Sequence, residues 1–332
     1  MQSDTFTGYL YRGRRGPVLV CLALYSHPSG ARIVGRGRRH ATVDIIGSQK
    51  IWTFSGSADG IKASSCGTIR KEPPCFVASY MELANKVAEL QFRNRDFVMM
   101  YRGQARDHAN RAGATSLKPS LLRSRVPNKL PTEREIGLRF ERLIAAEQAL
   151  VAEYTARQIL GRDRVKRQRI LRWAILQHYE ICETPLLDVT QSLRIAASFA
   201  SQHDGSDAYV FVLGIPQISG AITASAEAGI QIVRLASVCP PDAVRPHIQE
   251  GYLLGEYPEF ASADQGLHYE HAEMDFGRKL IAKFRFNPAE FWRGSAAFPR
   301  VDGEALYPLA AQDPMCELAN AVKARIATPA PG

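Results

Sequence analysis

Apolar residues recur at helical spacing in several stretches of the chain. The spacing over Tyr80–Leu90 places its large apolar side chains on one face of a helix. A longer stripe runs to Tyr154 and starts after Thr132, which forms a capping box with Glu135. Further helices are predicted over residues 165–179, from Thr190 or Gln191 to Ala200, and from Met315 to Ile326.

Short apolar runs bounded by turn residues predict strands. The clearest is Asp96–Arg102, which ends at Gly103 before a polar loop. Other strands or extended segments are predicted over residues 18–24, 43–46, 51–54, 186–190, 208–213, 230–238 and 276–286. These elements predict an α+β fold with a mixed or antiparallel sheet and flanking helices.

The first part of the chain has a different pattern of glycine and apolar residues. Glycines punctuate short apolar pieces up to residue 72, and Pro73-Pro74 then interrupts the pattern. We predict a small, β-rich, basic N-terminal unit over residues 1–74 and an α+β domain over 75–326. Residues 327–332 are expected to form a frayed tail.

The composition is that of a soluble globular chain. Of the 332 residues, 45% are hydrophobic and 23% are charged, which excludes a largely disordered protein. The longest apolar run, Val18–Tyr25, is too short to span a membrane, and we expect a buried strand there rather than a secretory signal. The six cysteines form no CxxC pair, so we expect a cytoplasmic protein without a structural metal or a disulfide framework.

Positive charge is concentrated in the first half of the chain. The net charge is +9, with +16 over residues 1–180 and −7 over the remainder. A basic face of this kind attracts phosphate-bearing partners, so RNA or DNA is a candidate partner of the N-terminal half. In the alternative interpretation, the two oppositely charged halves neutralise each other within one domain.

Three stretches resemble the FRG domain family, over about residues 75–326. They are Tyr101–Gln104 (YRGQ) followed by Ser116–Arg123 (SLKPSLLR), then Gln177–Ala200 with QHY, TPLLDVT and AASFA, and finally Arg245–Tyr252 (RPHIQEGY). The family commonly has Trp at the position of Val189 and often Arg at the position of Pro185. The order of these motifs is also similar to that of ADP-ribosyltransferases.

This second resemblance implies an NAD-dependent transferase that modifies a macromolecule, with nucleic acid favoured. It also implies a setting as a bacterial toxin or phage-defence protein, with an antitoxin or other regulatory partner. NAD is then the expected cofactor, and no metal and no membrane are expected. The alternative is a non-catalytic module that binds nucleic acid or protein. A nuclease is disfavoured because the carboxylates of residues 181–272 form no readable pair for Mg²⁺.

The proposed reaction assigns roles to nine residues. Arg102 suits the pyrophosphate because its planar fork binds phosphate with two hydrogen bonds, and Gly103 would admit the ligand close to the backbone. A carboxylate at Glu250 could stabilise a developing cation, whereas Gln249 could only orient the ribose. The predicted catalytic residues are Arg102, Thr190, Gln249 and Glu250, and the predicted cofactor-binding residues are Tyr101, Gly103, Gln104, His178 and Ser192.

Structural roles compete with each of these assignments. Arg102 could form an ion pair with Asp188, which we interpret as architectural rather than catalytic. His178 could be a satisfied buried histidine. Thr190 and Ser192 could simply cap the helix that follows them.

Overall fold

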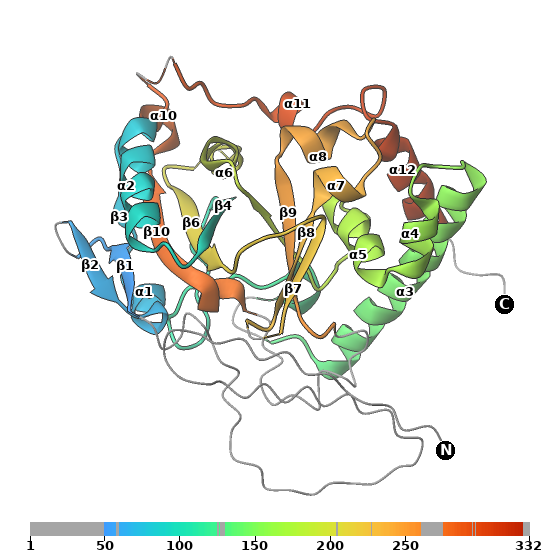
Figure 1. Cartoon of the computed structure of the whole chain (residues 1–332), viewed down its shortest axis with the longest axis horizontal. Coiled ribbons are helices and arrows are strands. Elements are labelled where there is room, and N and C mark those ends of the chain that lie inside the picture. Colours follow the sequence, from blue (N-terminus) through green and yellow to red (C-terminus); the bar gives the residue numbers. More distant parts are fainter. Residues whose placement is uncertain are drawn as a thin grey trace, which may run out of the picture. The chain divides into compact units, whose positions relative to one another are not determined.

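The structure is a computed structural model of the chain (Figure 1). It describes residues 50–57, 60–124, 126, 130–203, 205–226, 228–259, 275–293, 295 and 297–327. All of these lie within residues 41–332, the second of two units into which the chain divides. The strands predicted over residues 18–24 and 43–46 lie outside the described residues.

An eight-stranded mixed sheet forms the centre of the fold. Its strand order is β3-β10-β6-β4-β5-β9-β8-β7, and every neighbouring pair is antiparallel except β3 with β10. The strands are β3 (Cys75–Phe76), β4 (Val98–Gln104), β5 (Leu187–Thr190), β6 (Ala208–Ile215), β7 (Ile222–Ser225), β8 (Ile230–Arg234), β9 (Gly251–Glu256) and β10 (Leu280–Phe286). This arrangement confirms the predicted α+β class.

Helices cover the sheet in separate groups (Figure 1). α6 packs on β4 and β6, and α5 packs between α3 and β8, with α12 against α3. The helices are α1 (Cys66–Lys71), α2 (Tyr80–Arg93), α3 (Glu133–Ala156), α4 (Arg162–Arg167), α5 (Arg169–His178), α6 (Leu193–Ala200), α7 (Leu235–Val238), α8 (Val244–Ile248), α10 (Pro288–Phe291), α11 (Gly303–Leu306) and α12 (Pro314–Ala327), with 3-10 turns η1 (Ser120–Leu122) and η2 (Phe276–Lys279).

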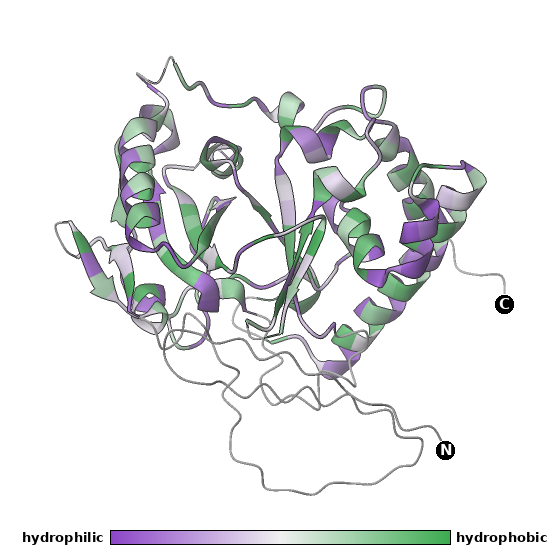
Figure 2. Ribbon diagram, in the orientation of Figure 1, coloured by the Kyte–Doolittle hydropathy of each residue, from purple (hydrophilic) through white to green (hydrophobic). Residues whose placement is uncertain are grey.

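Two hydrophobic clusters lie on opposite faces of the strands β8 and β9. Ile232 and Leu254 belong to the cluster around β6 and β10, whereas Val233 and Leu253 belong to the cluster beneath α3, α5 and α12. Because successive side chains of a strand alternate between faces, both faces of this part of the sheet are buried. The apolar residues accordingly concentrate on the strands and on the inner sides of the helices (Figure 2).

A small hairpin precedes the main sheet. β1 (Ile51–Phe54) pairs with β2 (Ile61–Ser64), and Ile51 and Phe54 join the same hydrophobic cluster as the central strands. Ile69 of α1 packs in that cluster too. The boundary at residue 74 stays a prediction, as does the unit over residues 1–74.

One predicted helix start is confirmed, and two other helix predictions need correction. The capping box of Thr132 and Glu135 is present at the start of α3. The helix predicted over 165–179 is wrong in one respect, because Gln168 is extended and separates α4 from α5. Arg172 Nη1 bonds the Val165 and Lys166 carbonyls at 2.9 and 3.0 Å, which stabilises the end of α4. The next helix starts after Ser192 rather than at Thr190 or Gln191.

Two strand predictions also need correction. The strand over 230–238 ends at Arg234 and continues as α7, because Leu235 and Val238 turn into the second cluster. The strand over 276–286 begins with the turn η2, where Asp275 Oδ1 accepts from the Gly277 amide at 3.0 Å. The sequence analysis did not identify β7 or β9.

Candidate functional site

The central sheet opens between β4 and β5. The register joins these two strands through the pair Tyr101–Thr190, whereas β4 pairs with β6 along its full length. Beyond that pair, the backbones of residues 102–104 and 187–189 form no strand pairing with each other. The Asp188 carbonyl instead accepts a hydrogen bond from Arg102 Nη1 at 2.5 Å, so a side chain replaces a backbone ladder bond.

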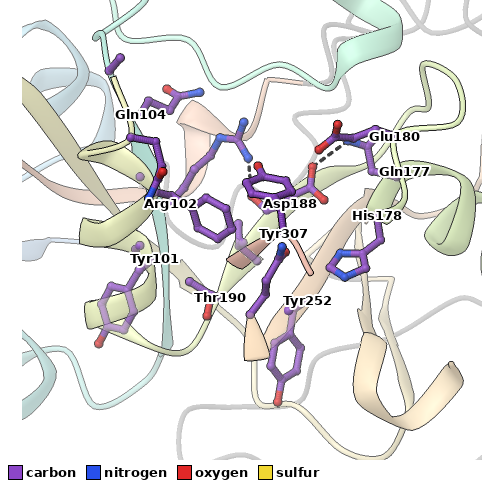
Figure 3. Close-up of a pocket in the computed structure, with 18 of the residues that line it drawn as sticks. Tyr101, Arg102, Gln104, Gln177, His178, Glu180, Asp188, Thr190, Tyr252 and Tyr307 are labelled. Atoms are coloured by element: carbon purple, nitrogen blue, oxygen red, sulfur yellow. Dashed lines mark hydrogen bonds between the residues drawn. The ribbon is translucent and has the colours of Figure 1, made fainter. Parts of the chain in front are cut away.

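A cavity of about 890 Å³ occupies this opening (Figure 3). Its wall combines residues from β4, α5, β5, α6, α8 and β9 with Tyr307, which follows α11. The volume lies within the range of about 300–1,000 Å³ that is typical of small-molecule sites. The opening of the sheet therefore produces a cavity of ligand size from segments far apart in the sequence.

A network of neutral side chains fixes the carboxylate of Asp188. Gln177 Nε2 donates to Asp188 Oδ2 at 2.7 Å, and Gln177 Oε1 accepts from Thr184 Oγ1 at 2.6 Å and from Ser120 Oγ at 3.2 Å. Burial raises the pKa of Asp188, while Arg102 and the bond from Gln177 act in the opposite direction. The carboxylate is thus held rigidly and faces the cavity beside a cation (Figure 3).

Arg102 keeps its charge despite its burial. Its pKa is lowered to about 10, chiefly by burial and also by the positive charge of Arg123, while Asp188 acts in the opposite direction. At neutral pH the guanidinium is therefore protonated. Its Nε is buried and finds no hydrogen-bond partner within the described part of the chain.

The opposite wall of the cavity contains His178 and Arg245. Burial and the charge of Arg245 hold the pKa of His178 well below its usual range, while a hydrogen bond to the Arg245 backbone raises it. Arg245 Nη2 binds Glu180 Oε1 at 2.7 Å, and the guanidinium lies 4.6 Å from the centre of the Tyr307 ring. His178 is consequently neutral at physiological pH.

Four buried polar atoms of the cavity wall have no partner among the described residues. They are Arg102 Nε, Arg245 Nε, Gln104 Oε1 and His178 Nε2. Two of them are donors and one is an acceptor, while the fourth, His178 Nε2, is also an acceptor when its neutral ring donates through the other nitrogen. Buried polar groups are almost always paired in folded proteins, so these atoms point to a ligand that both accepts and donates hydrogen bonds.

Most of the predicted site residues meet at this cavity. Seven of the nine line it: Tyr101, Arg102, Gly103, Gln104, His178, Thr190 and Gln249. Glu250 is exposed with φ 45° and does not line the cavity, and neither does Ser192. The structure therefore brings the YRGQ, QHY and LLDVT stretches together and leaves Glu250 apart.

Three of these residues also make contacts that support the fold. A Cβ on Gly103 would lie 1.8 Å from the Ala196 carbonyl oxygen, so the glycine admits helix α6 rather than only a ligand. Thr190 Oγ1 accepts from the Ser192 amide at 3.0 Å. Gln249 Nε2 donates to the Leu306 carbonyl at 2.7 Å, which occupies its amide nitrogen.

The ring of Tyr101 points away from the cluster around Arg102 (Figure 3). The sequence analysis placed four cavity residues outside the site or gave them no role. Asp188 was interpreted as architectural, Arg245 had no role although it opens the third motif, and Tyr307 and Arg106 were given no role. A side-chain ion pair between Arg102 and Asp188 does not form within 4 Å, because Arg102 binds the backbone carbonyl of that residue. The position of Arg245 at the start of a quoted motif was a usable signal.

The structure defines an α+β protein with a polar ligand cavity between two strands of its sheet. Residues 98–208 match the family model of the FRG domain, so the chain contains an FRG domain. The match runs from β4 to the start of β6 and includes Arg102 and Asp188, whereas Arg245 and Tyr307 lie beyond it. No curated protein and no solved structure matches the chain.

Two searches of the described residues gave no candidates. They contain no cluster of three or more His, Cys, Asp or Glu side chains that could hold a metal ion. None of the helices in the described ranges is long and apolar enough to cross a membrane.

Proposed function

We propose that the chain is an ADP-ribosyltransferase-like effector that cleaves NAD and transfers ADP-ribose to a macromolecule, with nucleic acid favoured. The observation that carries this proposal is the set of four unpartnered polar atoms around the cavity. NAD supplies the complementary groups, because its pyrophosphate accepts hydrogen bonds while its carboxamide and ribose hydroxyls donate them. A ligand with phosphate alone would leave His178 Nε2 and Gln104 Oε1 unpaired.

Arg102 and Arg245 are suited to the pyrophosphate. Each keeps a buried, unpartnered Nε, while one of its other nitrogens bonds the Asp188 carbonyl in Arg102 and Glu180 in Arg245. Charge-assisted hydrogen bonds from guanidinium to phosphate are about twice as strong as neutral ones. The Tyr307 ring lies against the guanidinium of Arg245, and it offers an aromatic face to a base or to the nicotinamide ring.

Asp188 takes the role of the carboxylate that the sequence analysis gave to Glu250. Cleavage breaks the bond between nicotinamide and ribose, and its electron pair leaves with nicotinamide. The nucleophilic atom of the acceptor then bonds the ribose carbon and releases its proton. A fixed carboxylate stabilises the positive charge that develops on the ribose. Asp188 lines the cavity and is held by Gln177, whereas Glu250 is exposed outside it.

The proposed cellular setting, a bacterial toxin or phage-defence protein, is what the resemblance to ADP-ribosyltransferases implies. We place the activity in the cytoplasm, in keeping with six cysteines that are scattered along the chain and form no CxxC pair. An antitoxin or other regulatory partner would restrain such an enzyme in its host cell.

The test is an incubation of purified protein with labelled NAD, with and without RNA, DNA or protein, followed by measurement of released nicotinamide and transferred label. Arg102→Lys is the critical variant, because a lysine can still reach the Asp188 carbonyl but supplies no second nitrogen. Arg139→Lys is the matched control, since Arg139 is buried outside the cavity and donates to the Leu121 and Arg123 carbonyls at 2.7 Å.

We expect nicotinamide release to fall at least about 100-fold in Arg102→Lys, as when one preorganised donor is removed from an active site. Release should persist in Arg139→Lys. Equal activity of the two variants would contradict the assignment of Arg102. Absence of release from the folded wild-type protein with every acceptor would contradict the transferase itself and favour a binding module.

A further inference from the structure

Two side chains of the loop that follows β4 extend the cavity wall outward. Arg106 and His108 are both exposed and both line the cavity. Asp107, between them, contacts the opposite side of the loop: its Oδ2 binds Lys283 Nζ at 2.9 Å and accepts from Thr115 Oγ1 at 3.0 Å. The buried ion pair therefore anchors the loop while its neighbours stay at the mouth of the cavity.

Local hydrogen bonds make this loop rigid. Asn110 Oδ1 accepts from the amides of Ala112 and Ala114 at 2.9 and 3.1 Å. The Ser116 amide donates to the His108 carbonyl at 2.7 Å and closes the loop. The position of Arg106 relative to the cavity is thus set by the fold rather than by a ligand.

A second cation, Arg123, directly follows the turn η1, and Ser120 of that turn contacts the cavity wall through the bond of its Oγ to Gln177 Oε1 at 3.2 Å. Its Nε donates to the Lys118 carbonyl at 2.7 Å, and its own carbonyl is held by Arg139. Desolvation lowers the pKa of His108, and the charges of Arg123 and Arg106 act in the same direction. His108 is therefore neutral at pH 7 and can offer a hydrogen bond rather than a charge.

Arg106 and Arg123 have no carboxylate within 4 Å among the described residues. Arg245, inside the cavity, has Glu180, and Arg93 and Arg157, on helix surfaces, have their own glutamates. Two exposed guanidinium groups without a close carboxylate beside one cavity favour a polyanion. A single dinucleotide would already find its arginines within the cavity, so these outer groups are left for a second, larger anion.

We infer that Arg106 and Arg123 form a docking surface for the phosphate backbone of a nucleic acid, whose acceptor atom is presented to the cavity. This inference rests on the proposed function, since it identifies the class of macromolecule that receives ADP-ribose. It also specifies which residues of the basic first 180 positions make the contact. The phosphates position the strand and the cavity receives one nucleotide of it.

The test measures binding without NAD, so that its outcome is independent of the cleavage assay. Labelled single-stranded RNA and DNA of 20 nucleotides are titrated with the full chain across a series of salt concentrations, with fluorescence anisotropy as the readout. The variants are Arg106→Ala/Arg123→Ala and, as a control of equal charge, Arg93→Ala/Arg157→Ala. Single Arg106→Glu and Arg123→Glu variants provide a second route if the double variant melts early.

We expect the docking-surface variant to weaken binding at least about tenfold at 0.1 M salt and to lower the slope of log affinity against log salt by about 1.5, since each lost phosphate contact removes about 0.7–0.9. The control variant should bind like the wild type. A preference for RNA or for DNA names the source of the backbone. Wild-type binding by the docking-surface variant, a flat salt response, or tighter binding of polyglutamate than of both nucleic acids would overturn the inference.

Discussion

Replacement of Asp188 by asparagine separates its chemical role from a structural one. The substitution keeps the size of the side chain and an oxygen that can accept the hydrogen bond from Gln177 Nε2, now 2.7 Å from Oδ2. It removes one negative charge from the cavity wall. The carbonyl that binds Arg102 belongs to the backbone and is unaffected.

The expected loss of rate follows from the charge alone. A full positive charge about 4 Å from a carboxylate gains about 4 kcal/mol at an effective dielectric constant of about 20. The neighbouring Arg102 offsets part of this gain. A loss of about 2.7–4 kcal/mol corresponds to about a 100- to 1,000-fold decrease in kcat/KM for nicotinamide release.

Stability should change in the opposite direction. Burial raises the pKa of Asp188 in the folded protein, so its contribution to stability is complete at low pH and is lost as the pH rises through that raised pKa. Ionisation of this buried carboxylate therefore opposes folding. Asp188→Asn should melt at the wild-type temperature or above it.

Kinetics of nicotinamide release and thermal melting, measured on the same preparations, decide the matter. Glu147→Gln is the contrasting variant, because this buried carboxylate outside the cavity binds Arg172 Nε at 2.6 Å and Trp173 Nε1 at 2.8 Å. It should lower the melting temperature and leave kcat/KM within a few fold. The reasoning is refuted if Asp188→Asn keeps its activity, or if it melts well below the wild type as a lost ion-pair partner would.

Two further substitutions test how the fold supports the site. Gly103→Ala places a Cβ against the Ala196 carbonyl oxygen, at 1.8 Å before relaxation, and should reduce the free energy of unfolding in urea by about 3 kcal/mol as α6 is displaced; wild-type stability would mean that α6 shifts freely. Thr132→Ala removes the capping box of α3 and should cost about 1 kcal/mol without changing nicotinamide release, which a joint measurement of denaturation and activity checks.

Local patterns account for what the sequence could predict of the fold. The helices α2 and α3 were located because their apolar stripes lie within one continuous segment, and the capping box of Thr132 marked the start of α3. The division between α4 and α5 depends on Arg172, whose guanidinium bonds carbonyls six and seven residues earlier. Strand β9 was not predicted from the sequence. It is defined by its pairing with β5 and β8, and this pairing joins segments that are far apart in the chain.

The same limit applied to the site. Motif order was enough to collect Arg102, Thr190 and Gln249, which do line one cavity. It could not determine that Glu250 is exposed. Gln249 and Glu250 are neighbours at a helix end, but Glu250 has a positive φ of 45°, and motif spacing does not encode the backbone angles that direct each side chain. Nor could it show whether Arg102 would bind the carboxylate or the carbonyl of Asp188, because that depends on where two strands stop pairing.

Arg102 takes part in both the fold and the proposed chemistry. One of its nitrogens binds a backbone carbonyl at the open part of the sheet, while another has no partner among the described residues. Nη1 satisfies the Asp188 carbonyl beside the open edge of β5, and the buried Nε is left for a ligand. Loss of the entire side chain would disturb both functions, so activity alone could not distinguish them. A lysine has a single nitrogen, which can serve the carbonyl or the ligand but not both. Wild-type stability combined with lost nicotinamide release in Arg102→Lys would therefore assign the nitrogen to the sheet and the missing contact to the substrate.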